Sequence, residues 1–350
     1  MLTLHIVRGP LDENLNLAIL NGYTALAHAT VTPENFLRWM QDSPEGPALH
    51  ALLKNQDGAL AGHCCLFPFP MNVDGKRVTA AKAEYFFVKT DFRKEAVQGY
   101  EGSMKPAAVL LLERLYRSGR ELGWCPYLVS APTEVAPLHR LAGCRKITIP
   151  LTECLLTFRP WKAAVSTPNL VTSQRTALAA VGTLQRLVWA FSPKLDPQVR
   201  AVPADAPSEI RETPQRISLS CDPDFLTWRY SASEYLRLRM ETSADLGVIV
   251  KRGSPDQYVR VCHSSLGSDE QSWKLILKAL IANALEENAL GVRWAVYDDG
   301  ASSNTFVALL RKMAFICVRR ERTIYVHGLG PADLQPAAWH LQDSLFCFDS

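Results

Sequence analysis

The sequence predicts a mixed α/β fold, with helices around a mixed sheet, built twice along the chain. Three observations support this prediction. The chain has 350 residues, and at roughly 150 residues per domain this length favours two domains. The string Phe-Leu-x-Trp occurs twice, at 36–39 and 225–228, each time just after a proline and an acidic residue. After each copy, the hydrophobic pattern passes in the same order through strands, a long helix, a strand, a short helix and a last strand.

Composition narrows the class of protein. With 47% hydrophobic and 21% charged residues, the chain has enough apolar material for a packed core, which excludes disorder over most of its length. The net charge of +3 favours neither a nucleic-acid partner nor a membrane-surface partner. The most apolar stretch, 176–193, is interrupted by Gln185 and Arg186, so no membrane span is expected.

The N-terminus and the cysteines predict where the protein resides. Residues 1–10 form a short predicted strand, and Asp12 and Glu13 follow at once, which is not the pattern of a secretion signal. The nine cysteines are an odd number without a CxxC pair, which is typical of a reducing compartment. We therefore expect a cytoplasmic protein.

The first half, residues 1–158, is predicted from turn and helix signals. Asp57-Gly58 and Asp74-Gly75 mark tight turns between alternating strands. Apolar residues from Ala108 to Leu115 recur at helical spacing, and Pro106 suits a first helical turn. The expected elements are hairpins over 48–69 and 71–89, a loop over 90–105, a helix over 106–121, a strand over 127–131, a helix over 135–142 and a strand over 147–158.

The second half, residues 217–350, repeats this order. Its clearest helix spans 269–288, where Trp273, Ile276 and Leu280 share one face. Around it we expect strands over 236–250, 258–263, 292–297 and 315–326, and a short helix over 304–313. Residues 159–216, rich in Pro, Ser and Ala, are expected to form a connection with one helix at 174–191.

The order of elements resembles the fold of the GNAT (GCN5-related N-acetyltransferase) family, here as two domains in tandem. The string 222–230, Tyr235, the Leu-Gly-Val strand at Leu246 and the tail 339–342 resemble the C-terminal domain of tandem GNAT proteins linked to surface-polysaccharide synthesis. The resemblance implies an acyl-CoA-dependent N-acyltransferase. Acetyl-CoA or another acyl-CoA would be the co-substrate, and a polar small-molecule amine, such as an amino sugar, the acceptor.

The phosphate loop that the resemblance implies falls at 103–108. Pro106 stands where the family has glycine and donates no N–H, whereas Ala108 agrees with the family and Lys105 supplies a positive charge. In an alternative alignment, Arg93 is itself the family's arginine, and a longer loop follows it. The resemblance thus implies these cofactor-binding residues: Phe87, Val88 and Lys89 at the strand end, Arg93, Lys105, Ala107 and Ala108. In the second half Asp269 and Glu270 occupy the same place and would repel a pyrophosphate, which favours the first half.

Acyl transfer to an amine needs a base, and the resemblance implies an acid on the short helix as well. Glu84 is the candidate base, and strand alternation predicts that it shares a face with Phe86 and Val88. The alternative is a carboxylate at the rim of the sheet or an ion pair with Lys82. His139 stands in place of the family's tyrosine as acid or base near neutral pH, and its alternative is an ordinary surface position. Ser130 and Thr133 are candidate substrate-binding residues, with ordinary turn positions as the alternative.

Other conspicuous residues are interpreted as structural. Trp39 and Trp228 are expected to anchor the core. His63, Cys64 and Cys65 are adjacent, but strand cysteines usually behave as small hydrophobic residues, and no spacing of His and Cys fits a zinc pattern. No metal site is predicted.

Three functions therefore remain open. The first is the acyl-CoA-dependent N-acyltransferase. The second is a Fem-type aminoacyl transferase, which the altered phosphate loop favours and the near-zero net charge disfavours. The third is a non-catalytic pair of domains that serves as a binding module, which predicts no binding of coenzyme A.

Overall fold

The computed structural model describes the chain in fifteen pieces. They are residues 2–27, 33–98, 104–125, 127–129, 135–166, 171–189, 197–204, 217–220, 222–231, 233–242, 247–265, 269–297, 301–329, 335 and 339–340. The strands of the main sheet are β1 (Thr3–Arg8), β2 (Leu49–Lys54), β3 (Leu60–Val73), β4 (Lys76–Val88), β7 (Tyr127–Val129), β8 (Arg145–Thr157), β9 (Val199–Pro203), β10 (Ile217–Leu219), β11 (Tyr235–Met240), β12 (Gly247–Lys251), β13 (Tyr258–Ser264), β14 (Gly291–Tyr297), β15 (Ile316–His327) and β16 (Trp339–His340).

Helices and a small hairpin complete the described part of the chain. The helices are α1 (Glu13–Ala27), α2 (Pro33–Gln41), α3 (Ala107–Glu121), α4 (Ala136–Leu141), α5 (Pro160–Ser166), α6 (Thr172–Val188), α7 (Pro223–Tyr230), α8 (Glu270–Glu286) and α9 (Ala301–Lys312). The hairpin, β5 (Ala96–Gln98) and β6 (Met104–Pro106), leads into α3 and follows a 3-10 turn at Thr90–Phe92. Each described helix is too short or too polar to cross a membrane.

The main sheet confirms the predicted mixed α/β fold. Its order is β1-β2-β3-β4-β7-β15-β8-β14-β13-β12-β11-β9. The neighbours β4 and β7 are parallel, as are β13 and β14, whereas the other neighbours along this path are antiparallel. The sequence β4-α3-β7-α4-β8 in the first half is repeated as β13-α8-β14-α9-β15 in the second.

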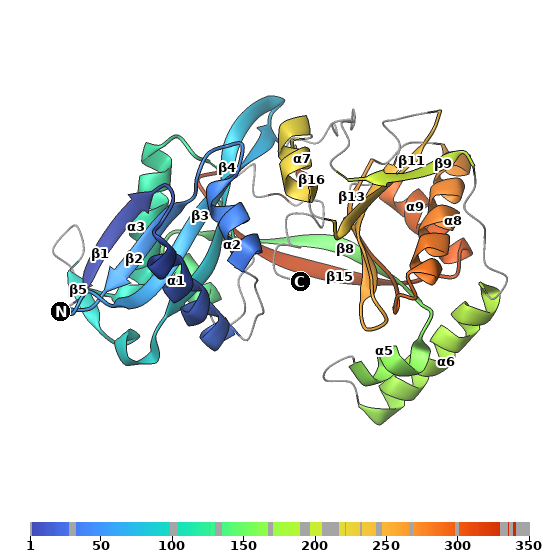
Figure 1. The fold of residues 1–350 in the computed structure, drawn as a ribbon, viewed down its shortest axis with the longest axis horizontal. Coiled ribbons are helices and arrows are strands. Elements are labelled where there is room, and N and C mark those ends of the chain that lie inside the picture. Colours follow the sequence, from blue (N-terminus) through green and yellow to red (C-terminus); the bar gives the residue numbers. More distant parts are fainter. Residues whose placement is uncertain are drawn as a thin grey trace.

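The two halves exchange their last strands. β8 belongs to the first half but pairs with β14, and β15 belongs to the second half but pairs with β7. β8 and β15 also pair with each other along most of their length, and Cys154 lies opposite Cys317 with 2.9 Å between the sulfur atoms. Figure 1 shows this pair of strands crossing between the two lobes. One sheet runs through both halves, so the sheet itself does not divide the chain at residues 158 and 216. These domain boundaries stay a prediction.

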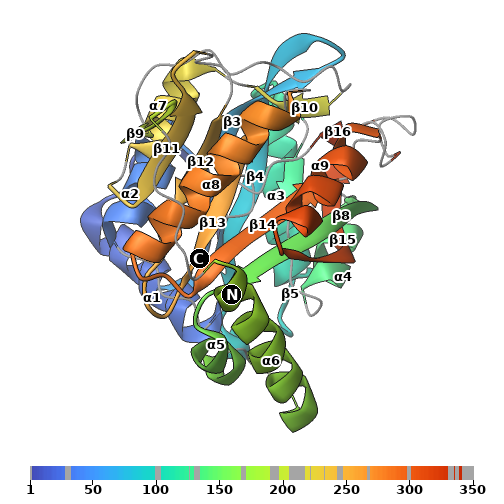
Figure 2. The same ribbon diagram turned by 90° about the vertical axis from the view of Figure 1, so that its right-hand side faces the viewer.

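Three hydrophobic cores fill the layers around the sheet. Residues of α3 and α4 pack on one face of the first half, and α8 and α9 cover the second half (Figures 1 and 2). The other face of the first half forms what we call the shared core, because residues of α1, α2, β3 and β4 pack there with residues of α7, β11, β12 and β13. Gly22 lets α1 approach the sheet, since a Cβ atom there would lie 2.5 Å from Cζ of Phe87.

Four details differ from the sequence prediction. The helix α1 was not expected, although the Asp12 carboxylate accepts a hydrogen bond from the Leu15 amide at its start, as a capping residue does. The loop predicted over 90–105 contains the β5–β6 hairpin. The strand predicted over 236–250 is two strands, β11 and β12, and β11 ends at Met240, just before the polar residues Glu241 and Thr242. The connection holds two helices, because Pro160 starts α5 ahead of the predicted α6.

Candidate functional site

A β-bulge interrupts β4 at Tyr85 and Phe86. In the β3–β4 ladder Cys65 lies opposite Glu84 and His63 lies opposite Phe87, so Tyr85 and Phe86 together face Cys64. Tyr85 has φ +53°, in the left-handed region that bulky residues rarely adopt. The conformation is held by packing of the Tyr85 ring on Phe36 and by a hydrogen bond of 3.0 Å from Nδ1 of His63 to the Tyr85 carbonyl. Strained backbone of this kind tends to gather at functional sites.

The strand splits from its parallel neighbour just before the bulge. The pairing of β4 with β7 consists of Ala81 with Tyr127 and Lys82 with Leu128. Directly after the end of β4, the Lys89 amide donates to the Ala61 carbonyl of β3 at 2.9 Å. Because backbone groups alternate in direction along a strand, the amide of Val88, which lies beyond the bulge, faces the opposite way. We call the edge of β4 at 86–88 that faces away from β3 the open edge, since no other described strand pairs with it.

The predicted cofactor-binding residues Phe87, Val88 and Lys89 do not all face the open edge, because neighbouring residues of a strand point in alternate directions. Val88 presents its backbone at the open edge. The Phe87 side chain is 3% exposed and packs in the shared core, and the Lys89 amide is engaged with Ala61. Arg93 folds back on the strand, because its Nε donates to the Val88 carbonyl at 3.0 Å. Of these residues, Val88 and Arg93 are the two that lie at the split.

The start of α3 is only partly available to an anion. Pro106 is the N-cap residue, and no side chain caps this end or brings a carboxylate into the first turn. The Ala107 amide donates to the Glu95 carbonyl at 3.0 Å, and Nζ of Lys105 is 2.6 Å from the Glu113 carboxylate. Ala108 is buried in the first turn. The positive charge that the sequence predicts at Lys105 is therefore balanced by an acidic residue of the same helix.

The start of α8 in the second half is already occupied by carboxylates. The Asp269 side chain accepts hydrogen bonds from the amides of Gln271 and Ser272 at 3.1 and 3.2 Å. Glu270 follows in the first turn and forms an ion pair with Lys274 at 2.9 Å. A pyrophosphate would have to displace these carboxylates, so the α3 end is the better anion site of the two.

Glu84 forms an ion pair with the nearly buried ammonium group of Lys82. Its predicted orientation is wrong. Glu84 lies opposite Cys65, a residue of the shared core, and Tyr85 belongs to the same core. Cross-strand partners share a face, so Glu84 points to the face of Tyr85 and away from that of Phe86 and Val88. The bulge shifts the alternation by one residue, which the sequence pattern does not reveal.

His139 lies in a buried hydrogen-bonded pair. It is 2% exposed, and its Nδ1 is 2.7 Å from the Tyr116 hydroxyl. The ring also approaches that of Phe86, with 5.8 Å between centroids. Burial lowers the pKa of His139 to about 4, so the imidazole is uncharged at neutral pH. His139 is therefore not at the surface, and its imidazole does not titrate near neutral pH. Ser130 and Thr133, the predicted substrate-binding residues, lie outside the described residues.

A cluster of potential metal ligands lies behind the bulge and was missed from the sequence. Nδ1 of His50 is 3.1 Å from Nε2 of His63, and their ligand atoms and Sγ of Cys65 all lie within 4.8 Å of one another. Burial lowers the pKa of His63 to about 4 and that of His50 well below its usual value. The spacing of residues along the chain did not reveal the cluster, because His50 and Cys65 come from different strands. Pairing the two strands of the predicted hairpin residue by residue would have placed His50 opposite Cys65.

Comparison with known proteins establishes the fold. No protein-family model and no curated relative matches the sequence. Solved structures do match: a GCN5-related N-acetyltransferase from Kribbella flavida covers 93% of this chain and 71% of its own, with 12% identity and a TM-score of 0.54. One from Anabaena variabilis covers 92% and 72%, with 12% identity and a TM-score of 0.52. An Enterococcus faecalis protein described as a "probable N-acyltransferase" covers 92% and 72%, with 11% identity and a TM-score of 0.56. The chain therefore has the fold of GCN5-related N-acetyltransferases.

Proposed function

We propose that the chain is an N-acyltransferase that takes its acyl group from an acyl-CoA, and that the first half holds this co-substrate. The observation that carries the proposal is the bulge at Tyr85, which lies beside the open edge of β4. A thioester carbonyl needs a hydrogen-bond donor that is fixed before the reaction, and the backbone amide of Val88 faces the open edge. The likeness to structures described as N-acetyltransferases supports the same reaction class.

The reaction moves one acyl group and one proton. The amine nitrogen forms a bond to the thioester carbonyl carbon, the carbon–sulfur bond breaks, and the sulfur leaves as a thiolate that takes up a proton. Glu84 is the proposed base that removes the proton from the amine. The open-edge amide of Val88 would stabilise the negative charge that develops on the carbonyl oxygen. His139, uncharged at neutral pH, is assigned no proton transfer in this scheme.

The residues of the first half fit an acyl-CoA better than those of the second. The extended pantetheine arm carries amide groups that can pair with the open edge, as a short added strand would. The first turn of α3 contains no carboxylate, whereas Asp269 and Glu270 stand at the start of α8. Arg93, next to Val88, provides a cation at the split between the strands.

A non-catalytic binding module is the alternative that a specific observation favours. At the start of α3, Pro106 donates no N–H, the Ala107 amide is bonded to Glu95, and Lys105 is paired with Glu113. Fewer groups are then left for a pyrophosphate than in a fully formed phosphate loop. This alternative predicts that the chain binds neither acetyl-CoA nor coenzyme A.

An acyl-transfer assay tests the proposal. The full chain is incubated with acetyl-CoA and a panel of polar amines that begins with amino sugars, and the release of the coenzyme A thiol is followed by a colorimetric reagent. We expect thiol release that depends on both the protein and one class of amine. Failure of every amine, together with failure of acetyl-CoA to bind, would support the non-catalytic module.

A further inference from the structure

The β2–β3 hairpin brings three metal-binding side chains to one face of the sheet. His50 of β2 lies directly opposite Cys65 of β3, so the two side chains share a face. His63 precedes Cys65 by two residues on the same strand and therefore points to the same side. Cys64, between them, packs on the opposite face in the core of α3 and α4. The hairpin register thus separates one cysteine from its neighbour and groups the other with two histidines.

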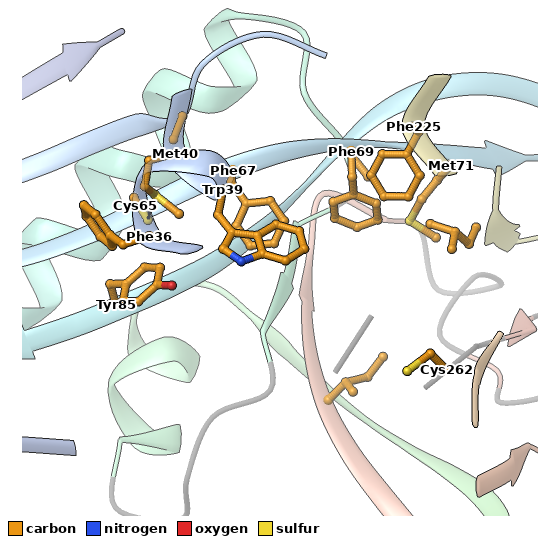
Figure 3. Packing of buried hydrophobic residues seen from close by; sticks show 14 of the residues in the cluster. Phe36, Trp39, Met40, Cys65, Phe67, Phe69, Met71, Tyr85, Phe225 and Cys262 are labelled. Atoms are coloured by element: carbon orange, nitrogen blue, oxygen red, sulfur yellow. Dashed lines mark hydrogen bonds between the residues drawn. The ribbon is translucent and has the colours of Figure 1, made fainter. Parts of the chain in front are cut away.

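The helix α2 adds a fourth soft atom from above the sheet. Sδ of Met40 lies 3.4 Å from Sγ of Cys65, and Figure 3 shows the two side chains side by side. All four residues are buried, with exposures of 1% for Met40, 1% for His50, and 0% for His63 and Cys65. The ligand atoms of two imidazoles and a thiol therefore lie within 4.8 Å of one another in the buried interior, and a thioether sulfur lies beside the thiol.

The hydrogen bonds of His63 match those of a metal-ligating histidine. A backbone carbonyl cannot donate, so Nδ1–H of His63 donates to the Tyr85 carbonyl at 3.0 Å, and Nε2 carries the lone pair. That lone pair points at Nδ1 of His50, 3.1 Å away. Ligating histidines usually donate their second N–H to a carbonyl or carboxylate in this way, which fixes the tautomer and the ring orientation.

We propose that His50, His63, Cys65 and Met40 form a binding site for one thiophilic metal ion, Cu(I) or Zn(II). Thiolate, thioether and imidazole ligands select these ions over hard cations such as Mg²⁺ or Ca²⁺. On binding, the Cys65 thiol releases its proton to solvent, and the proton on Nδ1 of His50 moves to Nε2. The ligand atoms must approach one another only modestly, because nitrogen and sulfur lie about 3.5 Å apart around a tetrahedral Zn(II).

Two of the proposed metal ligands contact the backbone of β4 at the bulge. His63 holds the Tyr85 carbonyl, and Sγ of Cys65 is 3.4 Å from the Glu84 carbonyl. A bound ion would therefore fix both residues that precede the open edge of β4. The role is structural, and it does not depend on whether the chain binds an acyl-CoA.

The test uses the untagged full chain, which is treated with a chelator and then refolded in Zn(II) or, without oxygen, in Cu(I). Refolding is included because the ligands are buried. Metal content after gel filtration is measured by mass spectrometry, and X-ray absorption of the loaded wild type identifies the ligand atoms. We expect one equivalent of one of these ions, bound by nitrogen and sulfur. A wild type that retains neither ion, or binds it through oxygen alone, would overturn the proposal.

Matched variants assign the ligands. Cys64→Ala and Cys65→Ala remove the same thiol from neighbouring buried positions on opposite faces, and circular dichroism shows whether each variant is folded. We expect Cys64→Ala to keep the metal and Cys65→Ala and His50→Gln to lose it. Binding that survives in a folded Cys65→Ala, or that is lost in a folded Cys64→Ala, contradicts the assignment. Since the wild type alone is used for X-ray absorption, the proposal remains testable if a variant does not fold.

Discussion

The indole rings of Trp39 and Trp228 meet edge to face, with 5.0 Å between their centroids and 84° between their planes. They come from the two copies of the Phe-Leu-x-Trp string, on α2 and α7, so the repeated sequence packs against itself at the junction of the halves. The guanidinium group of Arg229 lies 4.2 Å from the centre of the Trp39 ring and adds a cation–π contact. Trp39 is confirmed as a core anchor, with 5% exposure.

This contact predicts that the junction contributes strongly to stability. Trp39→Ala is expected to lower the free energy of unfolding by about 3–5 kcal/mol, because it leaves a large cavity and removes the cation–π contact of Arg229. Chemical denaturation measures the change. Trp161→Ala is the control, since Trp161 is 69% exposed and its loss should have little effect. Equal effects of the two substitutions would contradict the assigned role of Trp39.

The Glu84–Lys82 ion pair predicts a stability cost at the proposed base. Glu84→Gln leaves the ammonium group of Lys82 without this carboxylate in a site where the two side chains are only 14% and 4% exposed. The expected loss in the free energy of unfolding is about 3 kcal/mol, as for other nearly buried pairs that lose one partner. Denaturation curves of the single variant and the wild type measure it.

The double variant Lys82→Met/Glu84→Gln separates stability from chemistry. Replacing both partners is expected to restore most of the lost stability, because no charge is then left buried. If Glu84 is the base, the double variant stays inactive in the acyl-transfer assay although it is stable. Recovery of activity together with stability would show that Glu84 has only a structural role.

A substitution at Pro106 is predicted to change stability and ligand binding in opposite directions. Pro106→Asp places a capping carboxylate at the N-cap of α3, which is expected to stabilise the protein by about 1 kcal/mol. The same negative charge should repel a pyrophosphate and weaken acetyl-CoA binding. Thermal melting and calorimetric titration measure the two effects. Pro106→Ser is the matched control, because it caps the helix without a charge. Unchanged affinity in Pro106→Asp would place the phosphate elsewhere.

The buried His139 predicts a loss of stability in mild acid. Its pKa is about 4 in the folded protein against an ordinary value of 6.5, so the unfolded chain binds the proton first as the pH falls. The stabilising contribution is complete above pH 6.5 and decreases between pH 6.5 and 4, by roughly 3 kcal/mol in total. The Tyr116 hydroxyl and the Phe86 ring both contact the His139 ring, and both are uncharged in this range.

Unfolding curves between pH 7 and 5 for the wild type and His139→Gln isolate this contribution. The variant is expected to lose less stability over the interval than the wild type does. His5→Gln, at an exposed position of β1, should retain the wild-type dependence. If His139→Gln and the wild type have the same pH dependence, His139 is not the group responsible.

The regular parts of the fold could be predicted because their signals are local. Asp57-Gly58 and Asp74-Gly75 form the predicted turns, and α3 and α8 follow the apolar periodicity of their own residues. The bulge at Tyr85 could not be predicted, since no glycine marks the left-handed position. Its absence from the prediction is also why Glu84 was assigned to the wrong face. The exchange of β8 and β15 between the halves depends on contacts far apart in sequence, which no local pattern reports.

For the candidate site, the sequence predicted residues on β4 but did not show which of them are available, and their role in binding stays a prediction. Val88 and Arg93, two of the predicted cofactor-binding residues, lie at the split of the sheet. The positive charge of Lys105 is balanced by an ion pair with Glu113, eight residues further along the chain. The cluster of His50, His63 and Cys65 arises from cross-strand register, a relationship that the spacing of residues along the chain does not show.

The central claim is that the first half binds an acyl-CoA, and thermal melting with and without acetyl-CoA tests it most directly. A ligand that binds only the folded state adds about 2.7 kcal/mol of stability at a hundredfold excess over its dissociation constant. We predict a clear rise in the melting temperature of the wild type with acetyl-CoA and with free coenzyme A, and a smaller rise for Pro106→Asp. No rise with either ligand at millimolar concentration would contradict the claim and favour the non-catalytic module.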